Sequence, residues 1–486
     1  MHTTAKHWIN GEWQAIGREF PSINPANGKA IGSYFDGGEA AAQAAVDAAY
    51  AAFHNGNWRR DGMARATALS HLADVFASRL NEVIDTLCLE NGKLKAEATY
   101  EATYIPRSLR FAAGLAAQIF GRVLDPVPGK QSMCIRQPMG VAGLMIPWNS
   151  PGYLTIRALA PAMASGCTSI VKLGSPAAQT AALLASFCAE VPEIPKGAVN
   201  FFIESGSEGS RLLVASPKVP VISFTGSTKV GKEIAKAAAA NFKRVGLELG
   251  GKTPHLVFAD ANIDGALPVI EKALTTFAGQ FCMTGSRLLV ERSIVDEVRR
   301  RLSDRLEKVK PGPASDPASD IGPLISKSNV TRVNGLVNDA IAAGAKVLVR
   351  GGPSTDPALA GGAFYRPTLL EVSNSTLPIV QDEVFGPVLT LQSFDTEDEA
   401  VNLANDTMYG LSACIWSRDA DRPIRISRRL DAGLISVNSW ANLQMEFEEG
   451  GFKSSGIGRL GGMDCLEDFL EYKQITQDYA PLEEAR

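Results

Sequence analysis

Few of the residues that build disulfide frameworks and metal sites occur in this sequence. Its seven cysteines are scattered over 486 residues without a C-x-x-C pair, and its five histidines include no H-x-x-x-H pair. This distribution argues against a disulfide scaffold or a zinc ribbon and fits a reducing compartment. The spacing of the histidines predicts no bound metal.

Charge of one sign and long apolar segments are also lacking. The 48 basic and 52 acidic residues leave a formal charge of −4, and the basic residues are spread over the whole length. This argues against nucleic-acid and membrane-surface partners. No apolar run approaches the roughly 20 residues that cross a bilayer. The first residues, MHTTAKHWINGEWQ, lack the apolar or Arg-rich stretch of a targeting peptide, so we expect a cytoplasmic protein.

The composition that is present is typical of a large globular protein. Apolar residues make up 45% of the chain and charged residues 21%, which excludes extended disorder. A chain of this length can bury a large core without disulfides or metals. The length alone predicts two or three domains.

Short apolar runs alternate with helix-like segments over the middle of the chain. Five such runs occupy residues 141–146, 168–173, 198–203, 219–224 and 244–249. This alternation predicts a parallel sheet with crossover helices, and a ligand on such a sheet lies beyond the carboxyl ends of its strands. A second α/β stretch begins near Gly251. The strand-like segment 122–137, with the tail from about Met463, predicts a small accessory element for subunit contact.

Two glycine-containing segments are candidates for binding phosphate. Gly456, Gly458 and Gly461 match G-x-G-x-x-G, but no apolar strand precedes them and only 25 residues follow, so we interpret the match as a turn or chance. In SFTGSTKVGKEI, an apolar strand runs through Gly226 and Ser227 into a helix, whose N-terminus offers N–H groups to a pyrophosphate. An ordinary helix cap at Ser227 explains this second pattern equally well.

Three residues have the chemistry of a catalytic site. Cys282 lies between a long helix and an apolar strand, where a helix end can activate a thiol, although a single cysteine is more often a buried apolar residue. Glu248 ends an apolar strand, and a carboxylate there must be paired, solvated or functional. Asn149 follows the strand at 141–146, from which its amide could donate to an oxyanion.

Together these motifs resemble the aldehyde dehydrogenase superfamily over nearly the whole chain. The shared motifs are IPWNSP (146–151), FTGSTKVG (224–231), LELGGKTP (247–254), GQFC (279–282) and QDEVFGPVL (381–389). Cys282 also follows Glu248 by 34 positions, which is the family's usual spacing. The resemblance implies an α/β fold with two Rossmann-like parallel-sheet domains and a small β oligomerisation flap.

The same resemblance implies a domain organisation. Residues 1–121 and 138–250 would form a dinucleotide-binding domain, residues 251–440 a catalytic domain, and residues 122–137 with 463–486 the flap. Members of the family usually form dimers or tetramers by pairing strands of this flap. We therefore expect a homodimer or a homotetramer.

A mechanism is also implied by the resemblance. The thiolate of Cys282 attacks the aldehyde, and the amide of Asn149 and the backbone N–H of Cys282 hold the oxyanion of the thiohemiacetal. Hydride then passes to the nicotinamide, and Glu248 activates the water that hydrolyses the thioester. Acylating, CoA-dependent relatives usually lack this base, so its presence argues against them. The presence of all three residues, Asn149, Glu248 and Cys282, argues against the remaining alternative, a catalytically inactive relative with a structural role.

The cofactor implied by the resemblance is NAD or NADP. Its contacts would come from Ile146, Trp148, Lys172, Ser175, Gly226, Ser227, Gly231, Leu249, Glu383 and Phe385. Many relatives have a Glu at the position of Ser175, and that Glu binds the adenosine ribose and repels a 2′-phosphate. The sequence therefore predicts that NADP is tolerated or preferred.

The substrate pocket implied by the resemblance gives conflicting indications. Its residues would be Tyr153, Arg157, Trp440 and Phe447. Arg157 matches the arginine with which succinic semialdehyde dehydrogenases hold a carboxylate, and an Arg-Ala pair also occurs there in vanillin and salicylaldehyde dehydrogenases. Trp440 matches one wall of the aromatic box of betaine aldehyde dehydrogenases. Ser150 and Arg157 replace two other aromatic residues of that box, so a quaternary ammonium substrate is disfavoured.

Acidic residues near the expected pocket bear on the charge of the substrate. A salt bridge from Arg157 to Glu446 or Glu448 is as good an interpretation as a substrate contact. Glu448 and Glu449 stand where the family usually has Pro-Phe, and two carboxylates near the entrance would repel an anion. We favour a neutral aldehyde, with aromatic aldehydes as candidates, and keep a semialdehyde bound by Arg157 as the alternative.

Overall fold

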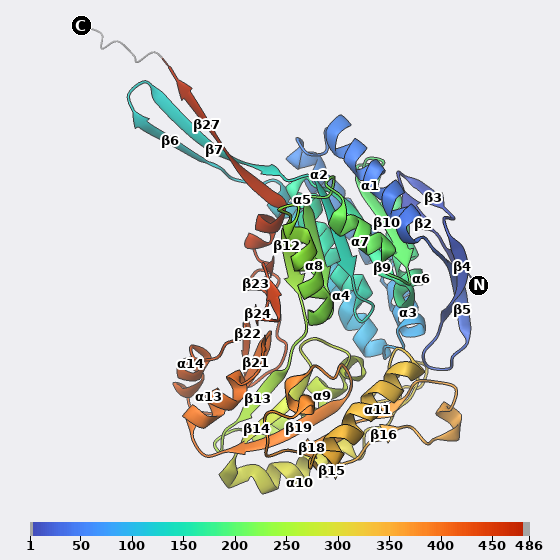
Figure 1. Ribbon diagram of the computed structural model, residues 1–486, viewed down its shortest axis with the longest axis vertical. Helices are drawn as coiled ribbons and strands as arrows, with labels where there is room; N and C mark the ends of the chain where they lie inside the picture. The colour runs from blue at the N-terminus through green and yellow to red at the C-terminus, as the bar shows by residue number, and fades with distance from the viewer. Residues whose placement is uncertain (1–2, 480–486) are drawn as a thin grey trace.

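A parallel sheet forms the centre of the N-terminal half (Figure 1). The computed structural model describes residues 3–479, and in it the five apolar runs form β8 (Val141–Ile146), β9 (Thr168–Gly174), β10 (Val199–Glu204), β11 (Val221–Thr225) and β12 (Arg244–Glu248). These strands lie in the order β12-β11-β8-β9-β10 and are all parallel, as predicted. Antiparallel β25 (Gly456–Ile457) extends one edge, and β2 (His7–Ile9) with β3 (Glu12–Gln14) extends the other.

Helices cover both faces of this sheet, because successive residues of a strand point to opposite sides. On one face, α1 (Gly38–Asn55), α7 (Glu208–Ala215) and α8 (Thr228–Ala239) share a core with Ile170 and Phe202. On the other face, Val171 and Phe201 belong to the core of α2 (Gly62–Ser78), α3 (Leu80–Glu90), α4 (Lys95–Ala116), α5 (Pro151–Ser165) and α6 (Ala178–Ala189). Both faces of the strands are therefore apolar, which explains their continuous hydrophobic runs.

A second, largely parallel sheet forms the centre of the C-terminal half. Its order is β15-β18-β19-β14-β13-β21-β22, with only β15 antiparallel. The strands are β13 (Thr253–Val257), β14 (Gly285–Glu291), β15 (Lys346–Val349), β18 (Thr368–Glu371), β19 (Val388–Phe394), β21 (Ser412–Trp416) and β22 (Leu434–Val437). The predicted fold class, α/β with two parallel-sheet units, is confirmed.

Helices lie on both faces of the second sheet as well. The core of one face contains residues of α9 (Ile263–Thr275), α10 (Val295–Leu306), α11 (Lys327–Ala342) and α12 (Pro378–Gln381). The core of the other face contains residues of α13 (Glu397–Asn405) and α14 (Arg422–Ser427). The segment PGPASDPASD lies outside named helices and strands, in agreement with its interpretation as a loop.

A three-stranded antiparallel sheet extends away from both halves, at the upper left of Figure 1. It consists of β6 (Arg122–Val127), β7 (Lys130–Pro138) and β27 (Leu470–Asp478), with β7 in the middle. The segment expected at 122–137 and the chain from Leu470 thus meet in one element, whereas residues 464–469, also expected in the flap, form a short 3-10 helix that packs into the core of the first half. The last residues of the expected flap, 480–486, lie outside the described part of the chain.

The remaining strands lie in small sheets of two or three strands. They are β1 (Thr3–Ala5), β4 (Arg18–Ile23), β5 (Ala30–Asp36), β16 (Gly352–Pro353), β17 (Tyr365–Arg366), β20 (Tyr409–Gly410), β23 (Glu448–Glu449), β24 (Phe452–Lys453) and β26 (Leu460–Gly461). Gly458 and Gly461, from the G-x-G-x-x-G match, have φ values of 87° and 69° and lie at tight turns near β25 and β26, as interpreted from the sequence. Within residues 3–479, no helix is long and apolar enough to cross a membrane. The same residues contain no group of three or more His, Cys, Asp or Glu side chains placed to hold a metal ion.

Candidate active site

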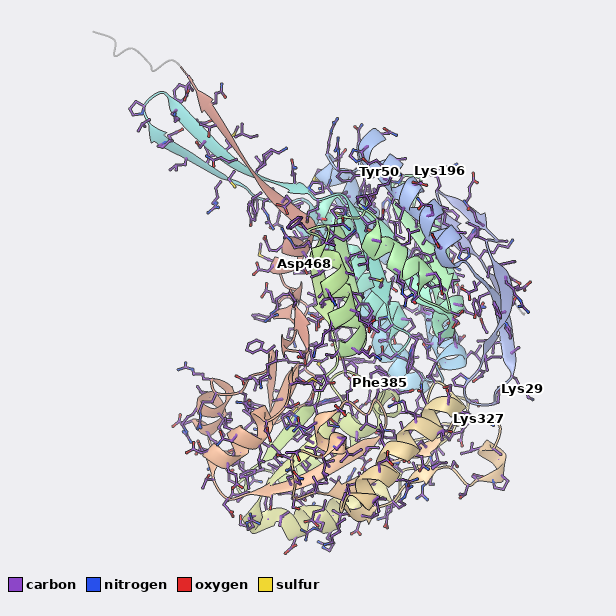
Figure 2. All side chains as sticks on the ribbon, in the orientation of Figure 1. Lys29, Tyr50, Lys196, Lys327, Phe385 and Asp468 are labelled. Carbon is purple, nitrogen blue, oxygen red and sulfur yellow. The ribbon has the colours of Figure 1, made fainter. Side chains whose placement is uncertain are left out.

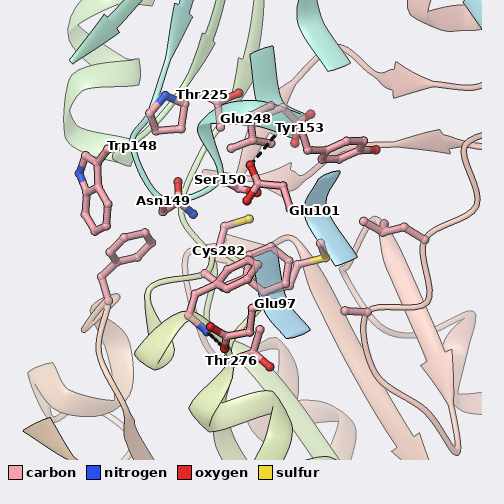
Figure 3. A pocket seen from close by; sticks show the side chains of 18 of the residues that line it. Glu97, Glu101, Trp148, Asn149, Ser150, Tyr153, Thr225, Glu248, Thr276 and Cys282 are labelled. Atoms are coloured by element: carbon pink, nitrogen blue, oxygen red, sulfur yellow. Dashed lines mark hydrogen bonds between the residues drawn. The ribbon is translucent and has the colours of Figure 1, made fainter. Parts of the chain in front are cut away.

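A cavity of about 730 Å³ is lined by residues from both halves of the molecule. Asn149 follows β8, Glu248 ends β12, and Cys282 precedes β14, and all three line this cavity. Figure 3 shows their side chains together in it. The three residues singled out as catalytic in the sequence therefore meet at the carboxyl ends of the strands of the first sheet, where α/β proteins bind ligands.

Cys282 is positioned by a sharp reversal of the chain after α9. Phe277 and Ala278 have φ values of 52° and 55°, a left-handed conformation that ends the helix and turns the chain toward β14. The carboxylate of Glu97 accepts a hydrogen bond of 2.7 Å from the backbone N–H of Phe277 and holds this turn. Cys282 keeps partial exposure, whereas Cys167, Cys188, Cys414 and Cys465 are buried.

The surroundings of Cys282 disfavour its charged form. Burial raises the pKa of the thiol to about 12, and the nearby guanidinium of Arg157 opposes this rise. Close packing also fixes the loop, because a Cβ on Gly251 would lie 2.3 Å from the carbonyl oxygen of Cys282. Only glycine allows this approach between the end of the first sheet and the cysteine loop.

Glu248 is a buried carboxylic acid with unused hydrogen-bonding capacity. Its Oε1 atom has no hydrogen-bond partner within residues 3–479, and the side chain faces the cavity. Burial raises the pKa of Glu248 to about 8, Arg157 lowers it and Glu449 raises it further. A carboxyl that titrates near neutral pH and has a free oxygen can accept a proton from water.

Asn149 presents an amide to the same space. Its Nδ2 donates one hydrogen bond of 3.0 Å to the carbonyl oxygen of Gln280, two residues before Cys282. An amide nitrogen carries two hydrogens, so one remains for a ligand. The hydrogen bond to Gln280 orients the amide beside the thiol, which suits an oxyanion-binding donor.

A buried ion pair that the sequence analysis missed supports this arrangement. Lys93 pairs with Glu101, and their side chains are only 2% and 1% exposed. Glu101 also accepts hydrogen bonds from the backbone N–H groups of Gly152 (2.8 Å) and Tyr153 (3.1 Å), at the N-terminus of α5. Figure 3 shows Glu101 directed at this helix end. Gly152 follows Asn149 by three residues, so Glu101 holds the segment that carries Asn149. In the sequence, the one indication of this role was the spacing of Glu97 and Glu101, which lie four residues apart and therefore on one face of a helix.

Six of the predicted cofactor residues line the cavity: Trp148, Gly226, Ser227, Leu249, Glu383 and Phe385. The rings of Trp148 and Phe385 meet edge to face with centroids 5.6 Å apart. Figure 2 shows Phe385 where the two halves of the molecule adjoin. Glu383 accepts a hydrogen bond of 3.1 Å from the N–H of Gly251, and burial raises its pKa to about 7. Ser227 caps α8 by accepting from the N–H of Val230.

The other four predicted cofactor residues lie outside this cavity. Ile146 ends β8, and Gly231 in α8 lies so close to Leu249 that a Cβ would be 2.4 Å from its Cδ2. Lys172 lies near the end of β9 with its Nζ 3.7 Å from Oε1 of Glu204, and Ser175 follows β9 within hydrogen-bonding reach of Tyr34.

The chemistry of these residues fits a dinucleotide. The ammonium of Lys172, the hydroxyls of Ser175 and Ser227 and the N-terminus of α8 lie at the carboxyl edge of the first sheet. The carboxylate of Glu383 and the rings of Trp148 and Phe385 line the adjoining cavity. Ammonium and hydroxyl groups can bind ribose and phosphate oxygens, and the N-terminus of α8 can bind a pyrophosphate. The capping role of Ser227 and an anion-binding role are compatible, since the cap uses only one N–H of the first turn.

Arg157 has a different partner from those considered in the sequence. Its Nη1 lies 2.9 Å from Oε1 of Glu449, and its Nη2 donates to Oγ1 of Thr225 at 3.2 Å. Glu446 instead pairs with Arg107, and Glu448 accepts from the backbone N–H of Met463. The salt bridge expected for Arg157 exists, but with the next residue along the strand.

Aromatic side chains form much of the remaining wall. The residues are Tyr100, Tyr104, Tyr153, Phe277, Phe281 and Trp440. The indole N–H of Trp440 donates to the carbonyl oxygen of Met283 at 2.7 Å, which fixes its ring beside the cysteine loop. Phe447 is not brought to this wall: it is 69% exposed, and a turn in which its N–H donates to the carbonyl oxygen of Gln444 precedes β23.

Comparison with known proteins gives a consistent result. A family model described as "Aldehyde dehydrogenase family" matches residues 12–475. The chain is 36% identical to betaine aldehyde dehydrogenase of Bacillus subtilis, over 98% of this chain and 97% of that protein. It is 37% identical to 2-hydroxymuconic semialdehyde dehydrogenase of a Pseudomonas species, over 97% and 98%. A crystal structure of betaine aldehyde dehydrogenase from Staphylococcus aureus in complex with NAD+ superposes with a TM-score of 0.95 at 33% identity, covering 99% of this chain and 96% of that one.

Proposed function

The chain belongs to the aldehyde dehydrogenase family, and from this premise we propose that it oxidises a neutral aldehyde to the carboxylic acid, with NAD or NADP as hydride acceptor. The observation that carries the proposal is the meeting of Cys282, Glu248 and Asn149 in one cavity lined by both halves of the molecule.

Cys282 is the proposed nucleophile. Its sulfur attacks the aldehyde carbon and forms a thiohemiacetal, whose oxyanion accepts hydrogen bonds from the free amide hydrogen of Asn149 and from the backbone N–H of Cys282. Each such donor is worth roughly 2.7 to 4 kcal/mol of the barrier. The guanidinium of Arg157 favours the thiolate, since it lowers the pKa of the thiol against the effect of burial.

Glu248 is the proposed general base. When bound, the nicotinamide cofactor supplies the acceptor for the hydride that leaves the thiohemiacetal. The thioester left on Cys282 is then attacked by a water whose proton goes to the free Oε1 of Glu248. The raised pKa of this carboxyl makes it a stronger base than an exposed glutamate, and the acid product leaves with the thiol restored.

The cofactor preference is proposed to include NADP. Ser175 puts a hydroxyl where a carboxylate would repel a 2′-phosphate, and the ammonium of Lys172 lies on the preceding strand. Dissociation constants of NADPH and NADH, with kcat/KM for both oxidised forms, test this for the wild type and for Ser175→Glu. We expect Ser175→Glu to lose NADPH affinity selectively. A wild type whose kcat/KM for NAD exceeds that for NADP by about tenfold or more contradicts the proposal.

A neutral substrate is supported by the walls of the pocket. Besides Trp148 and Phe385, six aromatic residues line it, and the charge of Arg157 is already matched by Glu449. The second candidate is an anionic semialdehyde held by Arg157. It draws on relatives named as semialdehyde dehydrogenases, among them succinate-semialdehyde dehydrogenase [NADP(+)] of Saccharomyces cerevisiae, and on the unpartnered Nε of Arg157 within residues 3–479.

Self-association through the three-stranded sheet is also proposed, as a homodimer or homotetramer. Val123, Leu124 and Val127 on β6 and Ile475 on β27 are exposed, and both outer strands of the sheet have free edges within the described chain. Sedimentation of a Leu124→Asp variant tests this.

The seven free cysteines support a reducing compartment such as the cytoplasm.

Replacing the nucleophile tests the proposed function. Cys282→Ser should abolish oxidation of every aldehyde in a panel while NADH and NADPH still bind with nearly wild-type affinity, because the thiol is needed for the covalent step alone. Cys88→Ser is the matched control, since Cys88 is also partly exposed but lies on α3. Activity of Cys282→Ser within about tenfold of the wild type would overturn the assignment.

A further inference from the structure

Arg157 lines the pocket and forms a nearly buried ion pair with Glu449. The side chains are 9% and 14% exposed, and Nη1 and Oε1 are 2.9 Å apart. Arg157 comes from α5, and Glu449 comes from β23, which pairs with β26 near the end of the chain. Thr225, at the end of β11, accepts a second hydrogen bond from the guanidinium at 3.2 Å. The cation is thus held from two sides.

A carboxylate on a substrate would have to compete with Glu449 for this cation. Glu449 cannot easily swing away, because β23 is anchored by its pairing with Leu460 and Gly461. If it were displaced, it would remain a poorly solvated carboxylate without a partner, which is costly in a protein interior. An aldehyde without charge meets no such competition.

The other cations of the lining also lie beside carboxylates. Lys272, on α9, is close enough to Glu97 to lower the pKa of that carboxyl. Arg332, on α11, donates to the carbonyl oxygen of Val384 and lies near Glu383 on the cofactor side. No lining cation among the described residues is therefore left unmatched for an anionic substrate.

We propose that Glu449 sets the charge preference of the substrate pocket: by pairing with Arg157 it excludes aldehydes that carry a carboxylate and keeps the pocket for neutral ones. This inference rests on the proposed function, because it concerns the aldehyde of that reaction. Glu449→Gln keeps the size and a hydrogen bond to Arg157 but removes the negative charge. The buried guanidinium then lacks a counter-ion and attracts a substrate carboxylate.

Benzaldehyde and 4-formylbenzoate, which differ by one carboxylate, test the proposal. The ratio of kcat/KM for 4-formylbenzoate over benzaldehyde should rise about tenfold or more in Glu449→Gln and return toward the wild-type value in Glu449→Asp, which restores the charge. Glu448→Gln is the matched control. Glu448 is the neighbouring residue on β23, but it is exposed and accepts from the backbone N–H of Met463 instead of pairing with Arg157, so the ratio should stay within about twofold of the wild type.

A binding measurement and an opposite variant complete the test. Benzoate should raise the Tm of Glu449→Gln more than that of the wild type, because it supplies the missing counter-ion. Arg157→Gln leaves Glu449 unmatched, so it should lower the ratio. If Glu449→Gln does not fold, the double variant Arg157→Gln/Glu449→Gln decides the matter, because its ratio should exceed that of Arg157→Gln only if the charge of Glu449 excludes the substrate carboxylate. Unchanged ratios in enzymes that oxidise benzaldehyde overturn the role of Glu449. A wild type that oxidises neither aldehyde, nor any other in a panel, overturns the proposed function instead.

Discussion

The pH dependence of turnover should follow the ionisation of Glu248. Burial raises the pKa of this carboxyl to about 8. Its carboxylate fraction therefore rises from roughly one-tenth at about pH 7 to roughly nine-tenths at about pH 9. A general base acts in the deprotonated form, so hydrolysis of the thioester should become about tenfold faster over this interval. The assay is steady-state formation of NADH or NADPH at saturating benzaldehyde, with single-turnover mixing to isolate the hydrolysis step.

Two variants separate Glu248 from other titrating groups. Glu248→Gln should form one reduced cofactor per active site in a burst and then stop, because the thioester is no longer hydrolysed. Glu383→Gln removes a second buried carboxyl, whose pKa is raised to about 7 and which is held by the N–H of Gly251. This variant should lose rate but keep the rise near pH 8. A flat wild-type profile, or a Glu248→Gln enzyme that keeps both turnover and the rise, would refute the reasoning.

Two further predictions concern the groups around the cysteine loop. Asn149→Ala removes an oxyanion donor and should lower kcat about 10²- to 10³-fold while the affinity for NADH stays nearly constant; a loss below about threefold would show that the amide is not used. Glu101→Gln leaves Lys93 as a buried cation without a charged partner and should reduce the free energy of unfolding by about 3 to 5 kcal/mol in urea titrations. Its kcat should fall too, since Glu101 holds the start of α5. A variant as stable as the wild type would contradict this role of the ion pair.

Strand positions and the catalytic trio could be predicted because local chemistry decides them. Runs such as 141–146 are apolar on both faces, and only a sheet covered on both sides accommodates them. Glu248 and Asn149 stood out as polar residues at the ends of such runs, and parallel strands bring these ends to one edge. The position of Cys282 beside them rests on the motif resemblance, because the reversal begins at Phe277 and Ala278, which are not residue types that favour positive φ, and the single Gly279 after them does not specify it.

Contacts between distant segments could not be predicted in the same way. The partner of Arg157 was expected at Glu446 or Glu448, but neighbouring residues of a strand point to opposite sides, so a shift of one residue decides between the pocket and solvent. Glu449 is turned toward Arg157, which lines the pocket, and Glu448 is exposed. Glu101 was missed for a similar reason: a charged residue in an Ala-rich helix is usually on the solvated face, and its burial depends on Lys93.

The covalent intermediate tests the central claim most directly. Glu248→Gln, mixed with benzaldehyde and NAD or NADP, should gain the mass of one benzoyl group per chain, and peptide mapping should place it on Cys282 as a thioester. Cys282→Ser with the same reagents should gain none. An adduct on another cysteine, or reduced cofactor formed by Glu248→Gln without any acyl-enzyme, would contradict the account.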